Sequence, residues 1–203
     1  MGFYEDRVLP HIIDMTCGAK PLRKLREQTC AGLTGDVLEV GFGSGLNVDH
    51  YPADVTMVSA VEPAEVGWKI AAKRVAASRV PIERSGLDGQ SLPFPDAHFD
   101  SALSTFTLCT IPDAGAALRE IRRVLKPGAQ LHFLEHGEAP DEKVQRMQKR
   151  WDPIQNRIAG GCSVSRPIVD MIRGAGFTVG EVSEFYGKGP KFMSAFSIGT
   201  ASA

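Results

Sequence analysis

The sequence predicts a single-domain α/β fold in which a mostly parallel sheet carries helices on both faces. Three observations support this class. Short β-rich runs alternate with helical stretches through the middle of the chain, the length of 203 residues suits one domain, and two further β-rich runs close the sequence. Strands separated by helices of this length pair in parallel, because the helix must cross over the sheet.

Composition limits the classes of function. Hydrophobic residues make up 43% and charged residues 23%, and the formal net charge is −1, so no general basic field favours a nucleic-acid partner. None of the four cysteines forms a CxxC pair, and their spacing suits neither a zinc site nor a disulfide framework. We therefore expect reduced thiols, no bound metal and a cytoplasmic location.

No membrane span is expected, because no apolar stretch reaches the roughly 18 residues that a spanning helix needs. The N-terminus carries acidic residues early and lacks the apolar core of a signal peptide. Peripheral contact with a membrane surface is left open, and the pattern does not define an oligomeric state.

The front segment, residues 3–30, predicts two helices, with Pro21 opening the second. Val8, Leu9, Ile12 and Ile13 fall on one side of the first helix. Three interpretations remain: a lid over a ligand site, a helix packed on the sheet for stability, or a membrane-surface helix. The last is disfavoured because the polar face is not predominantly basic.

The core elements follow in order. Strands are predicted at "DVLEVG", "VTMVSAVE", "HFDSALST" and "AQLHFLEHG", and helices at "PAEVGWKIAAKRVAAS" and "AGAALREIRRVLKPG". The second helix places Leu118, Ile121, Val124 and Leu125 on one face and is expected to stop at Pro127-Gly128. The tail predicts an antiparallel hairpin on the sheet edge, with a connection at residues 187–190.

A glycine-rich loop, "VLEVGFGSG", follows the first of these strands. Gly41, Gly43 and Gly45 permit positive φ and close approach of a ligand. A plain tight turn is the alternative. A dinucleotide fingerprint would place a glycine where Leu46 stands, which argues against a nicotinamide dehydrogenase, and no lysine of a Walker loop is present.

Two acidic residues flank this loop. Glu39 lies two residues before Gly41, where a carboxylate suits an ammonium-bearing ligand better than a pyrophosphate. Glu62 ends the next apolar run, and an acid there accepts hydrogen bonds from both hydroxyls of a ribose. The alternative for Glu62 is a solvated acid at a helix entry, since Pro63 follows.

Four blocks, "VLEVGFGSG", "VEP", "LPFPDAHFDSALSTFTLCTI" and "ALREIRRVLKPGAQLHFLEHG", together resemble class I S-adenosylmethionine-dependent methyltransferases over residues 36–137. The resemblance implies a seven-stranded sheet of order 3-2-1-4-5-7-6 with strand 7 antiparallel. It also implies S-adenosylmethionine as methyl donor, with S-adenosylhomocysteine as product and no metal. The glycine loop would hold the methionine portion, with Glu39 anchoring that end.

The resemblance extends to further donor residues. "LDGQSLPF" is similar to the adenine-binding turn of the family, with Asp88 at the acid and Gly89 where the family more often has alanine. Taken alone, Asp88-Gly89 is typical of a β-turn. The other residues assigned to the donor site are Asn47, Pro63, Ser104, Thr105 and, through the lid, Tyr4.

Methyl transfer from a sulfonium is an in-line displacement that positioning can accelerate. The sequence offers no obvious general base, so no catalytic residue is assigned. "STFTLCT" stands where enzymes that methylate nucleic-acid amines carry an Asn/Asp-Pro-Pro motif.

The blocks "TFTLCTIPD" and "QKRWDPIQNRIAGGCSVSR" resemble the small-molecule thiol methyltransferase-like branch, and also phospholipid N- and quinone-pathway C-methyltransferases. A small apolar thiol is the favoured acceptor, because a thiol near its pKa is partly ionised without a strong base. Amine or carbon methylation of a lipid or quinone precursor is the runner-up. A non-catalytic donor-binding module is the alternative of another class.

Candidate acceptor residues lie late in the chain. They are Cys109, His136, Trp151 and Arg166. Each has a plainer interpretation: apolar packing for Cys109 and Cys162, strand packing for His136, a core aromatic for Trp151 and a solvated first-turn residue for Arg166. Ser165 is expected to cap a helix. The predicted parts are a lid (1–30), a donor-binding core (35–137) and C-terminal helices with a hairpin (138–203).

Overall fold

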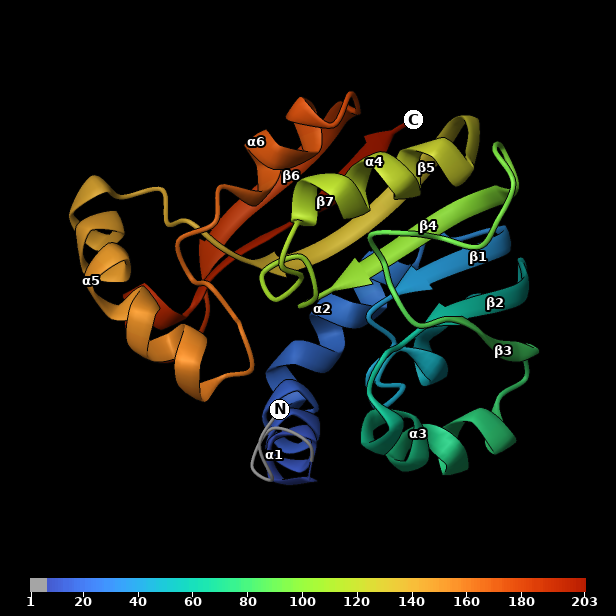
Figure 1. The fold of residues 1–203 in the computed structure, drawn as a ribbon, viewed down its shortest axis with the longest axis horizontal. Coiled ribbons are helices and arrows are strands. Elements are labelled where there is room, and N and C mark those ends of the chain that lie inside the picture. The colour runs from blue at the N-terminus through green and yellow to red at the C-terminus, as the bar shows by residue number, and fades with distance from the viewer. Residues whose placement is uncertain (1–6) are drawn as a thin grey trace.

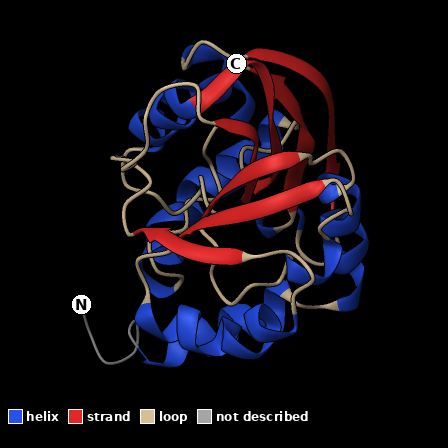
Figure 2. Cartoon of the chain, turned by 90° about the vertical axis from the view of Figure 1, so that its right-hand side faces the viewer, coloured by secondary structure: helices blue, strands red, loops and turns tan. Residues whose placement is uncertain are grey.

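A computed structural model describes residues 7–203, which form one seven-stranded sheet with helices on both sides (Figures 1 and 2). Across the sheet the strands are β3 (Ile82–Gly86), β2 (Val55–Val61), β1 (Gly35–Val40), β4 (Phe99–Thr105), β5 (Leu125–His136), β7 (Ala195–Ser202) and β6 (Thr178–Tyr186). β7 runs antiparallel to both neighbours, and the other pairs are parallel. The predicted strand order and terminal hairpin are confirmed.

The helices are α1 (Leu9–Cys17), α2 (Lys20–Cys30), α3 (Glu65–Ala77), α4 (Ala114–Val124), α5 (Glu142–Ile158) and α6 (Ile168–Gly174), with short 3-10 turns at η2 (Val48–His50) and η3 (Lys191–Met193). The two predicted N-terminal helices are present, and Pro21 lies in the first turn of α2. In Figure 1 the arrowheads of β1 and β4 point toward the side on which α1 and α5 lie.

The apolar core is divided by the sheet. On one face Leu38, Ala102 and Phe133 pack with Leu118 of α4 and Ile172 of α6. On the other face the neighbouring residues of the same strands, among them Val37 and Leu103, pack with Cys30 at the end of α2 and with Leu33 in the segment that follows it. Because successive strand residues point to opposite faces, both must be apolar when helices cover both sides. This explains the continuous apolar runs of the central strands.

Two local predictions are wrong. The sequence predicts Leu125 on the apolar face of a helix that stops at Pro127-Gly128, but α4 already ends at Val124. Leu125 begins β5 opposite Phe99 of β4, and Pro127 and Gly128 lie inside β5. Ser165 does not cap α6, which begins at Ile168 with Pro167 at the N-cap. The Ser165 hydroxyl donates instead to Oδ2 of Asp152 on α5, at 2.8 Å. This hydrogen bond orients the Ser165 side chain toward α5 and not toward the start of α6.

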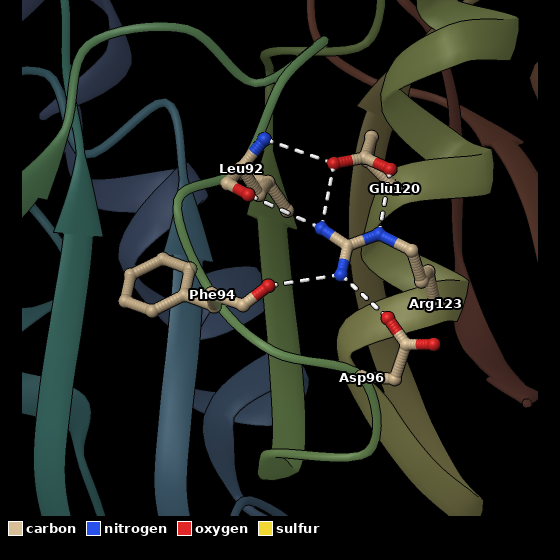
Figure 3. A network of polar contacts seen from close by, with 5 residues as sticks. All are labelled: Leu92, Phe94, Asp96, Glu120 and Arg123. Carbon is tan, nitrogen blue, oxygen red and sulfur yellow. Dashed lines mark hydrogen bonds and ion pairs between the residues drawn. The ribbon is translucent and has the colours of Figure 1, made fainter.

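Arg123 of α4 holds the segment between β3 and β4 against the helix (Figure 3). Its guanidinium donates to the carbonyls of Leu92 and Phe94 at 3.1 and 2.8 Å and to Asp96 Oδ1 at 2.7 Å. Glu120, one turn earlier, accepts from Arg123 Nε at 2.8 Å and from Leu92 N at 3.0 Å, and the hydrogen bond from Arg123 lowers the pKa of Glu120 to about 2. The segment that carries the predicted adenine turn is thereby attached to the core.

Candidate donor and acceptor site

The glycine loop, residues 41–47, connects the carboxyl end of β1 to η2. Gly41, Gly43 and Gly45 all have left-handed backbone angles, with φ of 78°, 56° and 75°. Any side chain is disfavoured there, because Cβ crowds the carbonyl of its own residue in this conformation. The three glycines are therefore required by the path of the backbone before any ligand is considered.

The space around each glycine differs. A Cβ on Gly41 would lie 2.0 Å from Thr107 Oγ1, and one on Gly45 would lie 3.2 Å from the Phe42 ring. A Cβ on Gly43 would meet nothing closer than Gly41 O at 3.9 Å. Gly41 and Gly45 thus face packed protein, whereas Gly43 faces open space beside the loop, the position that a ligand could occupy.

Glu62, at the end of β2, binds the same loop. Its Oε2 accepts from Gly43 N at 2.6 Å and its Oε1 from Ala64 N at 2.7 Å. Only 6% of Glu62 is exposed, and burial raises its pKa above the ordinary value. The contact with Gly43 was not foreseen. It brings Glu62 to the open side of the loop, and its predicted contact with a ribose stays a prediction. The carbonyl of Pro63 accepts from Arg84.

Glu39 is turned toward the protein. Its Oε1 accepts from Asn47 Nδ2 at 2.9 Å and its Oε2 accepts from the Tyr51 hydroxyl. Glu39 is 1% exposed, and burial raises its pKa to about 7 despite these two donors. The carboxyl therefore holds Asn47 at the end of the glycine loop, and its predicted direct contact with the donor stays a prediction.

Arg26 of α2 joins this group and was not predicted. Its Nη1 donates to Asn47 Oδ1 at 2.8 Å and to Thr105 Oγ1 at 2.9 Å, and Asn47 Nδ2 also donates to Thr105 Oγ1, at 3.0 Å. Arg26 is 4% exposed, and its buried Nε has no hydrogen-bond partner within residues 7–203. In the sequence it is one of several cations on an amphipathic helix, and only the fold brings it to the loop.

The remaining donor residues are placed as follows. Asp88 is exposed and accepts from Gln90 N at 2.8 Å and Gln90 Nε2 at 3.1 Å, so it closes its own turn. A Cβ on Gly89 would lie 2.8 Å from Val40 Cγ1, so this glycine permits the turn to approach the end of β1. Ser104 donates to Glu135 Oε1 at 2.7 Å, on the face of the sheet opposite Thr105. Their roles toward a donor stay predictions.

The helix α1 lies between the glycine loop and the segment after α5. Arg74 of α3 donates to Asp14 Oδ1 at 2.9 Å and to the Ser44 carbonyl at 2.8 Å. A Cβ on Gly160 would lie 2.7 Å from Leu9 Cδ2. Leu9 is buried, but the other apolar residues of the predicted face are 38–44% exposed: Val8, Ile12 and Ile13. Tyr4 falls outside the described residues.

Glu135, near the end of β5, is a buried acid that was not predicted as a site residue. It accepts from Ser104 Oγ at 2.7 Å and from Thr107 N at 3.0 Å, and it has no exposed surface. Burial raises its pKa to about 7. Glu135 fixes the chain that leaves β4 and carries Thr107, the residue that packs on Gly41.

Two of the predicted acceptor residues come together with a third residue. Cys162 Sγ lies 3.6 Å from Cys109 Sγ and 3.6 Å from His136 Nδ1. The contact between the two thiols lowers the pKa of Cys162. The same contact, together with burial, raises the pKa of Cys109. Cys109 is buried, as apolar packing predicts, and the end of β5 and the loop after α5 also bring both sulfurs close to an imidazole.

Trp151 and Arg166, the other two predicted acceptor residues, are engaged with other parts of the protein. Trp151 Nε1 donates to Gln155 Oε1 at 3.1 Å, and its ring packs edge-on against Phe192 with 5.6 Å between centroids. Arg166 Nη1 donates to the carbonyls of Leu108 and Ile111, at 2.6 and 2.5 Å. Arg166 therefore stabilises the loop after β4, and a contact with an anionic acceptor stays a prediction.

Over residues 7–203, no helix combines the length and apolar character that crossing a membrane requires.

Comparison with known proteins supports the architecture. Residues 38–133 match the family described as "Methyltransferase domain". The crystal structure of an S-adenosylmethionine dependent methyltransferase from Mesorhizobium loti superposes with a TM-score of 0.67 at 17% identity, over 92% of this chain and 99% of that one. This likeness shows a shared fold.

Two curated relatives are closer in sequence. Human thiol S-methyltransferase TMT1B is 32% identical over 158 residues, which cover 72% of this chain and 64% of the human protein. The 2-phytyl-1,4-naphtoquinone methyltransferase of Synechococcus elongatus is 44% identical over 101 residues, which cover 48% of this chain and 43% of that protein. The chain therefore spans less than two thirds of the length of either relative.

Proposed function

This chain belongs to the class I S-adenosylmethionine-dependent methyltransferases, and from that premise we propose that it transfers a methyl group from S-adenosylmethionine to a small, apolar thiol. The observation that carries the donor half of the proposal is the open space at Gly43, bordered by the buried carboxyl of Glu62. The acceptor half is supported by the thiol S-methyltransferases among the relatives.

The residues of the site suit the donor. S-adenosylmethionine, when bound, supplies an activated methyl group on a sulfonium sulfur. Gly43 leaves room for the methionine portion, and Glu62 would accept from the ribose hydroxyls. Arg26, whose buried Nε has no hydrogen-bond partner among the described residues, would supply positive charge for the carboxylate. Glu39 acts through Asn47, which it holds in place beside Arg26 and Thr105.

A thiol acceptor fits the chemistry available on this chain. The reaction needs a nucleophile aligned with the methyl group, and alignment alone can account for a large part of the acceleration. The buried acids Glu39 and Glu135 are engaged with protein donors, so neither is free to act as general base. A thiol requires the least assistance among the candidate acceptors, because it ionises near neutral pH.

A quinone precursor is the second candidate. It is favoured by the identity of 44% to the 2-phytyl-1,4-naphtoquinone methyltransferase, which exceeds the identity to the thiol enzymes but covers a shorter part of the chain. Because this match covers 48% of the chain, against 72% for the thiol S-methyltransferase, the quinone precursor ranks second.

The test is a turnover assay with isotopically labelled S-adenosylmethionine against alkyl and aryl thiols, amines, phenols, phospholipids and quinone precursors. The proposal predicts a methyl thioether as the main product. Methylation confined to carbon would favour the second candidate. Donor binding without a methylated product from any class would indicate a donor-binding module and contradict both.

A further inference from the structure

Outside the glycine loop, the fold gathers three side chains that are metal ligands in other proteins. Cys109 follows β4, His136 ends β5, and Cys162 lies in the loop after α5. Their ligand atoms all lie within 4.8 Å of one another. Cys109 and His136 are predicted acceptor residues, but neither the methyl-transfer proposal nor the resemblance to methyltransferases assigns the cluster a metal.

The spacing of the ligand atoms suits one tetrahedral ion. Zinc binds thiolate sulfur at about 2.3 Å and imidazole nitrogen at about 2.0–2.1 Å, which in a tetrahedron separates two sulfurs by about 3.8 Å and a sulfur from a nitrogen by about 3.5 Å. The Cys109 and Cys162 sulfurs are 3.6 Å apart, and Cys162 Sγ lies 3.6 Å from His136 Nδ1. Two edges of the site therefore already have the length that a bound zinc ion would impose.

The protonation of His136 provides an independent observation. Its Nε2 lies 2.5 Å from the carbonyl oxygen of Met193, which can only accept, so Nε2 carries the proton. The lone pair is then on Nδ1, the nitrogen that faces Cys162. Ligating histidines commonly donate their other ring N–H to a carbonyl or carboxylate in this way. The imidazole thus has the tautomer and orientation of a metal ligand.

The loop that carries Cys162 is held firmly. Asp152 of α5 accepts from Ser163 Oγ at 2.7 Å, from Val164 N at 2.6 Å and from Ser165 Oγ at 2.8 Å. Ser163 N donates to the carbonyl of Cys109 at 2.9 Å, which joins the two cysteine segments directly. These bonds fix the backbones of the two cysteine segments relative to each other, so the fold itself brings the two cysteines together.

We propose that Cys109, His136 and Cys162 bind a thiophilic divalent cation of the zinc class. Three protein ligands leave one position of a tetrahedral ion for an external ligand, the arrangement typical of reactive zinc sites. Cys109 and His136 are 2% and 8% exposed, and Cys162 is partly buried, so access to the ion is restricted.

The chemical class of the external ligand rests on the proposed function. The cluster begins two residues beyond Thr107, which packs on Gly41 of the glycine loop. An acceptor thiol that binds the ion forms a sulfur–metal bond and releases its proton to water. A lone pair of that sulfur then forms the new S–C bond, while the S–C bond of the donor breaks and leaves its electron pair on the donor sulfur. The metal would thereby activate and align the acceptor.

The test uses the full chain, reduced and stripped of metal with a chelator, titrated with Zn²⁺ by calorimetry and with Co²⁺ by absorption spectroscopy. We expect one ion per chain, a thiolate-to-cobalt charge-transfer band and a rise in melting temperature with Zn²⁺. Cys109→Ser, Cys162→Ser and His136→Gln should each lose stoichiometric binding. Cys30→Ala, which removes a buried thiol at the end of α2 that is not part of the cluster, should retain it.

Several results would overturn the proposal. One is Zn²⁺ affinity that is the same in Cys109→Ser and Cys162→Ser as in the unsubstituted chain. Another is a cobalt spectrum without a thiolate band, which requires no variant and so does not depend on the folding of any. A third is a chain in which Cys109 and Cys162 form a disulfide and which, once that disulfide is fully reduced, still binds no stoichiometric metal.

The external position is tested by adding an alkyl thiol to the Co²⁺-loaded chain. A change in the cobalt bands is expected, and an unchanged spectrum would refute a thiol as the fourth ligand. Because metal binding is measured without S-adenosylmethionine, its failure leaves the methyl-transfer proposal intact, and the failure of methyl transfer leaves the metal result readable.

Discussion

The glycine-loop side of the site and the Cys-His side are assembled in different ways. On the glycine-loop side, Glu39, Gly43, Asn47 and Glu62 lie within one strand–loop–strand unit and are bonded in pairs, Glu39 to Asn47 and Glu62 to Gly43, while Arg26 and Thr105 join Asn47 from other elements. On the other side Cys109, His136 and Cys162 come from three separate elements. The first side is a local motif on a strand end, whereas the second exists only when the sheet and the loop after α5 have packed.

The largest expected effect comes from a substitution that disrupts the glycine-loop side alone. Gly43→Val fills the open space at the loop and should abolish measurable donor binding by calorimetry. Gly128→Val is the matched control, because Gly128 also has positive φ, 79° against 56°, with nothing within 4 Å of its Cβ position. Both variants carry the cost of a left-handed side chain. Normal donor titration of the Gly43 variant would show that the loop is only a turn.

The free energy of unfolding should depend on pH through two buried acids, Glu39 beside the glycine loop and Glu135 near the end of β5. Burial raises the pKa of Glu39 and of Glu135 from 4.5 to about 7, so each carboxyl favours the folded state while protonated. This contribution is full below pH 4.5, is lost as pH rises through about 7, and amounts to about 3 kcal/mol for each group.

Denaturant unfolding at several pH values between these limits checks this expectation. Glu39→Gln and Glu135→Gln should each flatten the fall in unfolding free energy, while Glu27→Gln, at an exposed position on α2, should leave it unchanged. A fall of equal steepness in all three variants would mean that the buried acids are not its origin.

Glu62→Ala should weaken donor binding by about ten- to a hundredfold, because losing a hydrogen bond to a charged acceptor costs about 1.5–3 kcal/mol. The loss includes the bond to Gly43 N, so the variant also loosens the loop. Donor calorimetry on the folded variant measures the effect. Unchanged affinity would remove Glu62 from the donor site.

The smallest effect concerns the link between the two sides through α1. Asp14→Ala breaks a partly exposed ion pair with Arg74, in which the side chains are 26% and 32% exposed, and should lower stability by less than about 1 kcal/mol. If α1 acts as a lid, turnover should fall more than donor affinity. Turnover equal to that of the unsubstituted chain would leave α1 with a structural role alone.

The sequence predicts features built from neighbouring residues better than features that depend on contacts between distant segments. The β1 strand, the glycine loop and the hairpin are signalled by residues that are near neighbours in the chain, and the resemblance to methyltransferases supplied the order of the strands. The expected cap at Ser165 failed because its hydroxyl is taken by Asp152, thirteen residues earlier on α5. Arg26 was missed because a helical arginine looks solvated until the fold places it beside Asn47. Contacts between distant segments carry no local signal.

The most direct test of this account measures donor affinity and thiol methylation rate on the same preparations of Gly43→Val and His136→Gln. Gly43→Val should lose donor binding and, with it, methylation. His136→Gln should bind S-adenosylmethionine as the unsubstituted chain does and lose most of its turnover with thiols. The account is contradicted if Gly43→Val binds the donor normally, or if His136→Gln methylates the same thiols at the full rate.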